Sequence, residues 1–388
     1  MHLVETYALQ AGGKIGQMNV YPKFYPLPFD NYICIQPFSK NSKSYSYWEE
    51  VLQLIFPFLS KMGISIVQVG GKDERALPLC HHTQGKTSFG QLEYILSKAA
   101  LVLTADSISS HLAGYFDIPR VVLISNNYKN CVAPYFGSKW KEILLEPPER
   151  AAGTKPSFAL DEANKAIDTI KPEVIAASVA SLLQENFFYP FETTRFGGLY
   201  NARMVESIPN QVVDIKSLNI PSIIMRMDVE FNETNLAAQL SHCPVSIVTN
   251  KPINRDLLKT YAKNITELFY LVELDNEPSF IKDVINLGIK CHLMTNLSES
   301  VIRPIRIHYM DYGIISIRNV QKPKELEGIN NLYYKSGKFT LSNGKVYPSH
   351  AAYKDNLSIS NFSHTPLPVI DREDFWSEHD HFYFLTYK

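Results

Sequence analysis

Residues 101–119 have the sequence LVLTADSISSHLAGYFDIP. An apolar run opens this stretch, and Asp106, Ser107 and Ser109 follow it with the side chains that cap helix N-termini. The pattern predicts a buried strand, a short polar turn and a helix that carries His111 on its first turn. A helix start at the carboxyl end of a parallel strand offers backbone N–H groups to a phosphate, so this turn is a candidate anion site. The alternative is an ordinary capped helix with a surface histidine.

Strand-like and helix-like segments alternate on both sides of this stretch. Residues 32–36 and 64–69 have the composition of buried strands, and apolar residues at spacings of three and four predict a helix over 48–62 between them. Residues 120–125 supply the next strand. This alternation is typical of a parallel sheet with right-handed crossovers, so we expect an α/β fold.

A second alternating run follows an aperiodic, aromatic segment at 186–210, where we place the domain boundary. We therefore expect two Rossmann-like domains that face each other across a cleft. The first is expected to span 1–185. The second is expected to span 190–388, with a β-rich extension from about residue 305.

The composition narrows the class of protein. The chain has 388 residues, of which 45% are hydrophobic and 20% charged, and these values exclude disorder over most of its length. Its 38 basic and 39 acidic residues give a net charge of −1. No overall positive field therefore favours nucleic acid or anionic lipid as a partner.

The sequence also bears on location and on metals. No apolar run approaches the roughly 20 residues of a transmembrane helix, and the first residues lack the pattern of a signal peptide. We expect a cytoplasmic protein without a transmembrane segment. The cysteines are scattered and none forms a C-x-x-C pair, which predicts free thiols and no metal site.

The opening stretch and its surroundings resemble the nucleotide-sugar-binding domain of the heptosyltransferases, glycosyltransferase family 9, which has the GT-B fold. The family pattern is Asp-(Ser/Thr)-Gly-x-x-His-Leu-Ala, followed by a short helix and Gly-x-Pro. The positions that match it here are Asp106, Ser107, His111, Leu112, Ala113 and Pro119. Four other segments resemble the family's lysine loop, glycine pair with glutamate, helix entry and closing helices, in the order 36–45, 67–74, 85–92 and 165–183. The resemblance covers about 30–185.

The resemblance implies a donor site for a nucleotide-diphosphate sugar, which would be a co-substrate, with no cofactor and no metal ion. The implied donor-binding residues are Lys43, Gly70, Gly71, Glu74, Asp106, Ser107 and His111. Lys43 would neutralise the diphosphate and Glu74 would bind ribose hydroxyls. Asp106, Ser107 and the amides after them would hold the diphosphate beside His111, and these groups would stabilise the charge of the leaving diphosphate. The alternatives are that Lys43 is a solvated loop lysine and that Glu74 is a carboxylate at the start of a helix.

Two features depart from the family. Ile108 stands where the family has a glycine, whose lack of a side chain lets backbone approach a phosphate closely. In the family the acceptor domain precedes the donor domain, whereas the donor-like segment here begins near residue 30. We therefore expect the donor domain to come first in the chain.

The second half supplies the candidate catalytic base. Asp228 and Glu230 follow a predicted strand at 222–227. A carboxylate at the carboxyl end of such a strand lies at the edge where ligands bind, and a general base there would take the proton of an acceptor hydroxyl. The alternative is that one of these residues caps the helix that begins near Glu233.

Three functions follow from these features. The first is inverting, metal-independent transfer of a sugar from a nucleotide-sugar donor to a hydroxyl acceptor, which would be a glycan or a hydroxylated DNA base. The near-neutral net charge disfavours the DNA acceptor. The second is a nucleotide-sugar epimerase of GT-B shape, which needs no acceptor. The third is a nucleotide- or carbohydrate-binding protein without turnover, which Ile108 favours.

Overall fold

The computed structural model describes the residues in the ranges 1–185, 187–195, 199–200, 202–218, 220, 222–276, 278–318, 320–362 and 365–388. The chain divides into two compact units, Met1–Thr193 and Thr194–Lys388. No helix in the described ranges combines the length and the apolar character that crossing a bilayer requires.

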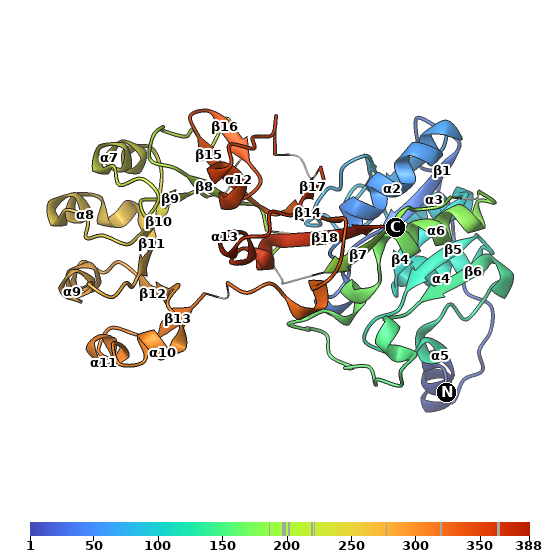
Figure 1. The fold of residues 1–388 in the computed structure, drawn as a ribbon. Helices are drawn as coiled ribbons and strands as arrows, with labels where there is room; N and C mark the ends of the chain where they lie inside the picture. The colour runs from blue at the N-terminus through green and yellow to red at the C-terminus, as the bar shows by residue number, and fades with distance from the viewer. Residues whose placement is uncertain are drawn as a thin grey trace. The chain divides into compact units, whose positions relative to one another are not determined.

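A six-stranded parallel sheet lies at the centre of the first unit (Figure 1). Its strands are β1 (Tyr32–Gln36), β2 (Ser65–Gln68), β3 (His81–His82), β4 (Leu101–Ala105), β5 (Arg120–Leu123) and β6 (Glu142–Leu145). Their order in the sheet is β3-β2-β1-β4-β5-β6, and every neighbouring pair is parallel. The order reverses between β1 and β4, and at such a switch point doubly wound sheets bind their ligands. The predicted α/β construction with a parallel sheet is confirmed.

Helices cover both faces of this sheet. The helices of this unit are α1 (Leu3–Gln10), which buries no residue, α2 (Trp48–Lys61), α3 (Phe89–Lys98), α4 (Ile108–Tyr115), α5 (Lys129–Val132) and α6 (Pro172–Leu182). α2 packs against α6, and α3 packs against α4. Crossovers that leave β1 and β4 in opposite directions place their helices on opposite faces. All residues of β4 and β5 are consequently buried, which explains why both strands are continuous apolar runs in the sequence.

The second unit is built on an eight-stranded sheet. Its strands are β8 (Met204–Ser207), β9 (Ile224–Arg226), β10 (Val245–Thr249), β11 (Ile265–Leu271), β12 (Cys291–Thr295), β13 (Ile315–Ile317), β15 (Lys338–Ser342) and β16 (Lys345–Tyr347). The order is β13-β12-β11-β10-β9-β8-β15-β16, in which only β16 is antiparallel to its neighbour. β8 to β13 therefore follow one another in chain order on one side of β8, and the order reverses between β8 and β15.

This sequential order has a consequence for the helices of the second unit. They are α7 (Glu233–His242), α8 (Arg255–Tyr261), α9 (Ser279–Asn286), α10 (Glu299–Ile302) and α11 (Arg306–Tyr309). Successive right-handed crossovers in one direction place every connecting helix on the same face, and Figure 1 shows these helices stacked along one side of the sheet. In β10 the buried residues alternate with half-buried ones. The buried residues of β10 pack on the helices. The opposite face of the sheet lines a cavity.

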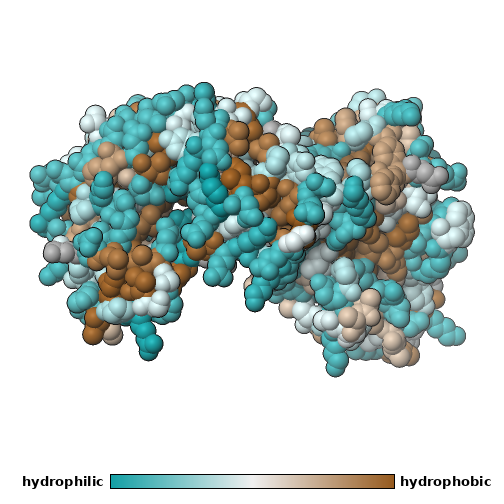
Figure 2. All heavy atoms as spheres, viewed as in Figure 1, coloured by the Kyte–Doolittle hydropathy of each residue, from teal (hydrophilic) through white to brown (hydrophobic). Residues whose placement is uncertain are grey.

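The β13 edge of this sheet carries exposed apolar side chains. Hydrophobic atoms gather over α10 and α11 in Figure 2, where Ile307, Met310 and Ile314 are exposed. An apolar edge strand of this kind is prone to pair with another chain.

A smaller sheet completes the second unit. Its strands are β7 (Phe191–Arg195), which spans the boundary between the units, β14 (Leu332–Ser336), β17 (Leu367–Pro368) and β18 (Phe382–Tyr387), in the order β17-β14-β18-β7. Two short helices, α12 (His350–Lys354) and α13 (Glu373–Trp376), accompany it. Aromatic residues such as Tyr334, Phe375 and Phe382 form its core. The residues after 305 thus add strands and the two short helices α12 and α13. These reach the open face of the large sheet, which is the face that α7 to α11 leave uncovered.

Candidate functional site

The switch point of the first unit is built from the ends of β1 and β4. Gln36, the last residue of β1, pairs with Thr104, the residue before the last one of β4. β4 then leads into α4 through a turn that consists of Asp106 and Ser107. The Asp106 amide donates to the Leu123 carbonyl at 3.0 Å, which continues the sheet by one more hydrogen bond. The turn is therefore held rigidly at the carboxyl edge of the sheet.

Three residues from the sequence prediction meet at this turn. Lys43 comes from the 3-10 turn that follows β1, and its Nζ lies 2.5 Å from Asp106 Oδ2. His111 Nε2 lies 3.8 Å from Asp106 Oδ1. The Asp106 side chain is 8% exposed, whereas those of Lys43 and His111 are 22% and 29% exposed. A buried carboxylate thus holds two partly exposed nitrogen-bearing groups at the start of α4.

The electrostatics of His111 follow from this position. Burial lowers the pKa of His111 below 6.5, and His2 and Lys43 lower it further, although Asp106 opposes them. Near neutral pH the ring is therefore mainly neutral, with one N–H donor and one acceptor nitrogen.

Ser107 does not cap α4, contrary to the expected role of its side chain. Its Oγ donates to Gln36 Oε1 at 2.9 Å and lies 2.9 Å from Thr104 Oγ1, so the hydroxyl joins the ends of β1 and β4. No side chain caps the helix at this position. Ile108, the first residue of α4, is 43% exposed at the place where the family has glycine.

Gly70, Gly71 and Glu74 form a separate small loop after β2. The Gly71 amide donates to Glu74 Oε1 at 2.9 Å. A Cβ at Gly70, whose φ is +151°, would lie 2.0 Å from Glu74 Oε2, so only glycine leaves room for this carboxylate. Burial raises the pKa of Glu74, although the Gly71 amide opposes the rise. In the described part of the chain, no hydrogen bond or ion pair joins Glu74 to Lys43, Asp106 or His111.

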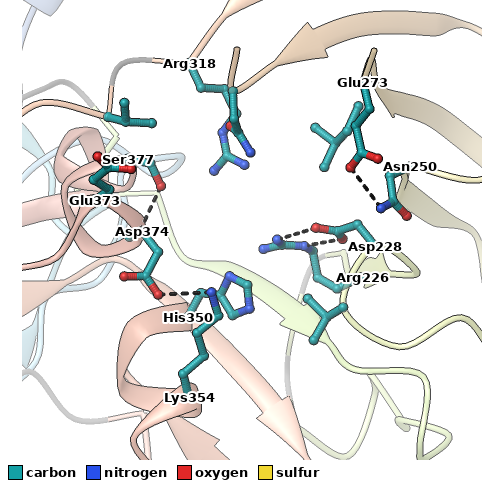
Figure 3. A pocket seen from close by; sticks show the side chains of 14 residues that line it. Arg226, Asp228, Asn250, Glu273, Arg318, His350, Lys354, Glu373, Asp374 and Ser377 are labelled. Atoms are coloured by element: carbon teal, nitrogen blue, oxygen red, sulfur yellow. Dashed lines mark hydrogen bonds and ion pairs between the residues drawn. The ribbon is translucent and has the colours of Figure 1, made fainter. Parts of the chain in front are cut away.

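The second unit holds a cavity of about 450 Å³ at the carboxyl edge of its large sheet (Figure 3). The cavity is lined by one polar residue after each of five consecutive strands, namely Asp228, Asn250, Glu273, Asn296 and Arg318. α12 and α13 close the other side with His350, Lys354, Glu373, Asp374 and the adjoining Ser377. Of all these residues, only Asp228 was predicted from the sequence. The other strand-end residues could have been found from the polar residue that stands one or two positions after each strand.

The structure separates the two carboxylates that were predicted as bases. Arg226 Nε and Nη2 donate to the two oxygens of Asp228, each at 2.7 Å. Asp228 lines the cavity, but both of its oxygens already accept hydrogen bonds. Glu230 is exposed, does not line the cavity, and accepts from Asn210 Nδ2 at 3.5 Å. The side chain that caps α7 is Asn232, so the alternative role of Asp228 or Glu230 as its cap is wrong.

A buried charge cluster lies beneath Asp228 on the open face of the sheet. Arg226 Nη1 donates to Glu206 at 2.6 Å, and Lys338 Nζ lies 2.7 Å from the other Glu206 oxygen. Lys338 also lies 3.7 Å from Glu378. Burial opposes ionisation of Glu206, but Arg226 and Lys338 hold its pKa below the usual range. Removing one partner from such a cluster leaves an uncompensated buried charge, which typically costs about 3–5 kcal/mol.

No protein-family model matches the chain, and no curated protein matches it. Solved structures are similar to part of it. A glycosyltransferase family 9 protein from Veillonella parvula DSM 2008 has 20% identity and a TM-score of 0.33, over 40% of this chain and 47% of that one. The ADP-heptose lps heptosyltransferase II of E. coli has 14% identity and a TM-score of 0.32, over 46% of this chain and 50% of that one. E. coli heptosyltransferase WaaC with ADP has 14% identity and a TM-score of 0.30, over 46% and 54%.

The chain thus spans about half the length of the solved structures that it matches. The similarity to family 9 heptosyltransferases that the sequence predicted is confirmed over 40–46% of the chain, at low identity.

Proposed function

We propose that the first unit binds the diphosphate of a nucleotide sugar where β1 and β4 end, and that the protein transfers the sugar to a hydroxyl acceptor. The observation that carries this proposal is the meeting of Lys43, Asp106 and His111 at the switch point of a β3-β2-β1-β4-β5-β6 sheet. Sheets with this strand order bind nucleotides at this edge.

The contacts indicate how a diphosphate would be held. Asp106 uses one oxygen to fix Lys43 Nζ, and an ammonium group has three N–H donors, so two remain for phosphate oxygens. The neutral ring of His111 adds a further donor beside them. The first amides of α4, which no side chain caps, complete the set. Because charge grows on the diphosphate as the sugar leaves, the same groups would stabilise the transition state.

The proposal extends to the reaction and its acceptor. Transfer is inverting and independent of metal, as the resemblance implies, and the acceptor is a glycan hydroxyl. Asp228 is the proposed general base because it lines the cavity of the second unit, and Glu230 is the second candidate. For Asp228 to accept a proton, one of its two contacts with Arg226 has to open.

One observation favours nucleotide binding without turnover. The exposed side chain of Ile108 stands at the first residue of α4, where it restricts how closely a phosphate approaches the helix amides. A binding protein tolerates the longer distance better than an enzyme, which has to hold the leaving group tightly.

A two-step experiment tests the proposal. Thermal shift with nucleoside diphosphates of each base first asks whether any of them raises the melting temperature. The ligand is then supplied as a nucleotide sugar, alone and with glycan acceptors, and products are followed by mass spectrometry and NMR. Transfer to an acceptor supports the proposal. An isomer of unchanged mass indicates the epimerase, and binding without any product indicates the binding protein. No stabilisation by any nucleotide would overturn the donor site.

A further inference from the structure

We propose that the cavity of the second unit, defined by Arg318 and the strand ends beside it, is a binding site for a sugar that carries one carboxylate or phosphate group. The cavity lies outside the carboxyl ends of β9 to β13, where parallel α/β sheets place their ligands. Its volume of about 450 Å³ falls within the range of small-molecule sites. It also adjoins a second cavity of about 410 Å³ along the open face of the sheet.

The ion pairs inside the cavity leave one cation available for an anionic ligand. Arg226 is paired with Asp228 at 2.7 Å, and Lys354 is paired with Asp374 at 3.2 Å. Among the described residues, the guanidinium of Arg318 has no carboxylate within ion-pair distance, and Figure 3 shows it pointing into the cavity. Arginine stays charged at every physiological pH. The cavity therefore offers one unpaired positive charge whose planar donors match a carboxylate or a phosphate.

The other charges limit what that anion is attached to. The lining has three permanent cations, Arg226, Arg318 and Lys354, against four carboxylates, Asp228, Glu273, Glu373 and Asp374. This excess of carboxylates would repel a diphosphate or any other polyanion. A ligand with a single anionic group directed at Arg318 meets less of that repulsion and pairs with the one cation that has no carboxylate partner among the described residues.

The remaining groups suit hydroxyls. Asn250 Nδ2 donates to one oxygen of Glu273 at 3.1 Å, which leaves the second oxygen available. In the part of the chain that the structure describes, the side chains of Asn296 and Glu373 make no hydrogen bond, and His350 Nε2 is buried without a partner. These amide, carboxylate and imidazole groups surround the cavity and can both donate to and accept from hydroxyls.

An apolar wall completes the site. Leu271 lines both this cavity and the adjoining one, where Val248, Phe269 and Met294 continue the apolar surface along the sheet. A sugar ring has hydroxyls at its edge and C–H groups on its faces, so it matches a site with polar strand ends and an apolar floor. This inference concerns the second unit alone and does not rest on the donor site of the first.

Calorimetric titration of the full chain without nucleotide tests the inference. The probes are hexuronic acids, sialic acid and hexose phosphates, with glucose, acetate and inorganic phosphate for comparison. We expect an acidic sugar to bind and Arg318→Gln to weaken it roughly tenfold to hundredfold, the usual effect of losing a charge-assisted hydrogen bond. The matched control is Arg303→Gln, which removes an exposed arginine beside α10. It should bind as wild type does.

The probes also separate the sources of the anion and the outcomes that oppose the inference. Tighter binding of uronic acids identifies a carboxylate ligand, and tighter binding of hexose phosphates a phosphate ligand. Asn296→Ala, at an exposed strand end, should weaken binding of the acidic sugar while leaving the melting temperature unchanged. Asn296→Ala provides the test of the site if Arg318→Gln fails to fold. Binding by no acidic sugar, equal binding of acetate or phosphate alone, or unchanged binding in both variants would overturn the inference.

Discussion

Lys43 is the residue on which the donor proposal depends most directly. Its ammonium lies 2.5 Å from Asp106, and only the phosphates of a nucleotide would feel its charge. Lys43→Ala should raise the dissociation constant of nucleoside diphosphates roughly tenfold to hundredfold and leave that of bare nucleosides unchanged, as measured by calorimetry. Lys98→Ala, an exposed lysine before the amino end of β4, is the matched control. Equal losses for nucleoside and nucleotide would show that the lysine is structural.

His111 gives the same site a dependence on pH. Because the pKa of His111 is lowered by burial, most rings are neutral at pH 6.5 in the free protein. A phosphate beside the ring would raise this pKa, so nucleotide binding at pH 6.5 should take up protons. Titrations in two buffers of different ionisation enthalpy measure the uptake, and His111→Ala should reduce it. If wild type and variant took up the same number of protons, the ring would not face the phosphate.

Asp228 is tested by separating binding from chemistry. An amide cannot take a proton, so Asp228→Asn should abolish sugar transfer and leave nucleotide affinity unchanged, because a base acts on the acceptor. Glu230→Gln tests the second candidate in the same assay and, because Glu230 does not line the cavity, should keep its activity if Asp228 is the base. Transfer assays and nucleotide titrations on the same preparations provide both readouts. Full transfer by Asp228→Asn would remove this residue from the mechanism.

At the scale of elements, the loop after β2 depends on a glycine. Ala at position 70 would place its Cβ 2.0 Å from Glu74 Oε2, at a φ of +151° that other residues rarely adopt. Gly70→Ala should therefore expel the Glu74 carboxylate and destabilise the protein by roughly 1–3 kcal/mol, which a urea or thermal melt measures. Gly16→Ala, where a Cβ meets nothing within 4 Å, should be close to neutral. A Gly70→Ala protein as stable as wild type would mean that the loop adapts freely.

The elements of the first unit were predictable because their burial is recorded in local sequence. β4 and β5 are covered on both faces, so each is a continuous apolar run, and the polar turn at Asp106 marks where α4 begins. The meeting of Lys43 with Asp106 depends on β1 lying next to β4, and periodicity does not contain that information. The family resemblance supplied it.

The cavity of the second unit was largely beyond prediction for the same reason. Arg318 and His350 come together only because five strands follow one another in order and the segment after β16 folds back over their ends. The alternation of β10, buried and half-buried, indicates a sheet with one open face, but not what covers that face. The bidentate contact between Arg226 and Asp228 could not be predicted either, although only one residue separates them in the sequence.

At the scale of the whole molecule, buried histidines should govern stability in acid. Burial lowers the pKa of His350 and of His381 to about 3. An unfolded histidine titrates near 6.5, so the unfolded chain binds more protons between these values. The contribution of these two histidines to stability is therefore fully present above about pH 6.5, and it should be lost as the pH drops toward about 3. His381→Gln should flatten this decline in thermal melts between pH 7 and 4, whereas exposed His308→Gln should not. Parallel declines in all three proteins would exclude His381 as a cause.

The pairing of β8 with β15 joins segments that the ribosome makes far apart in time. Lys338, at the start of β15, pairs with Met204 in β8 and neutralises Glu206, although about 130 residues separate the two strands. At the usual speed of translation those residues take on the order of ten seconds to synthesise. During that interval the edge of β8 has no neighbour on one side, and the Glu206 carboxylate lacks one of its two cations. The first unit is complete before this wait begins, so newly made chains should be most vulnerable to chaperone capture and mispairing while they wait for β15.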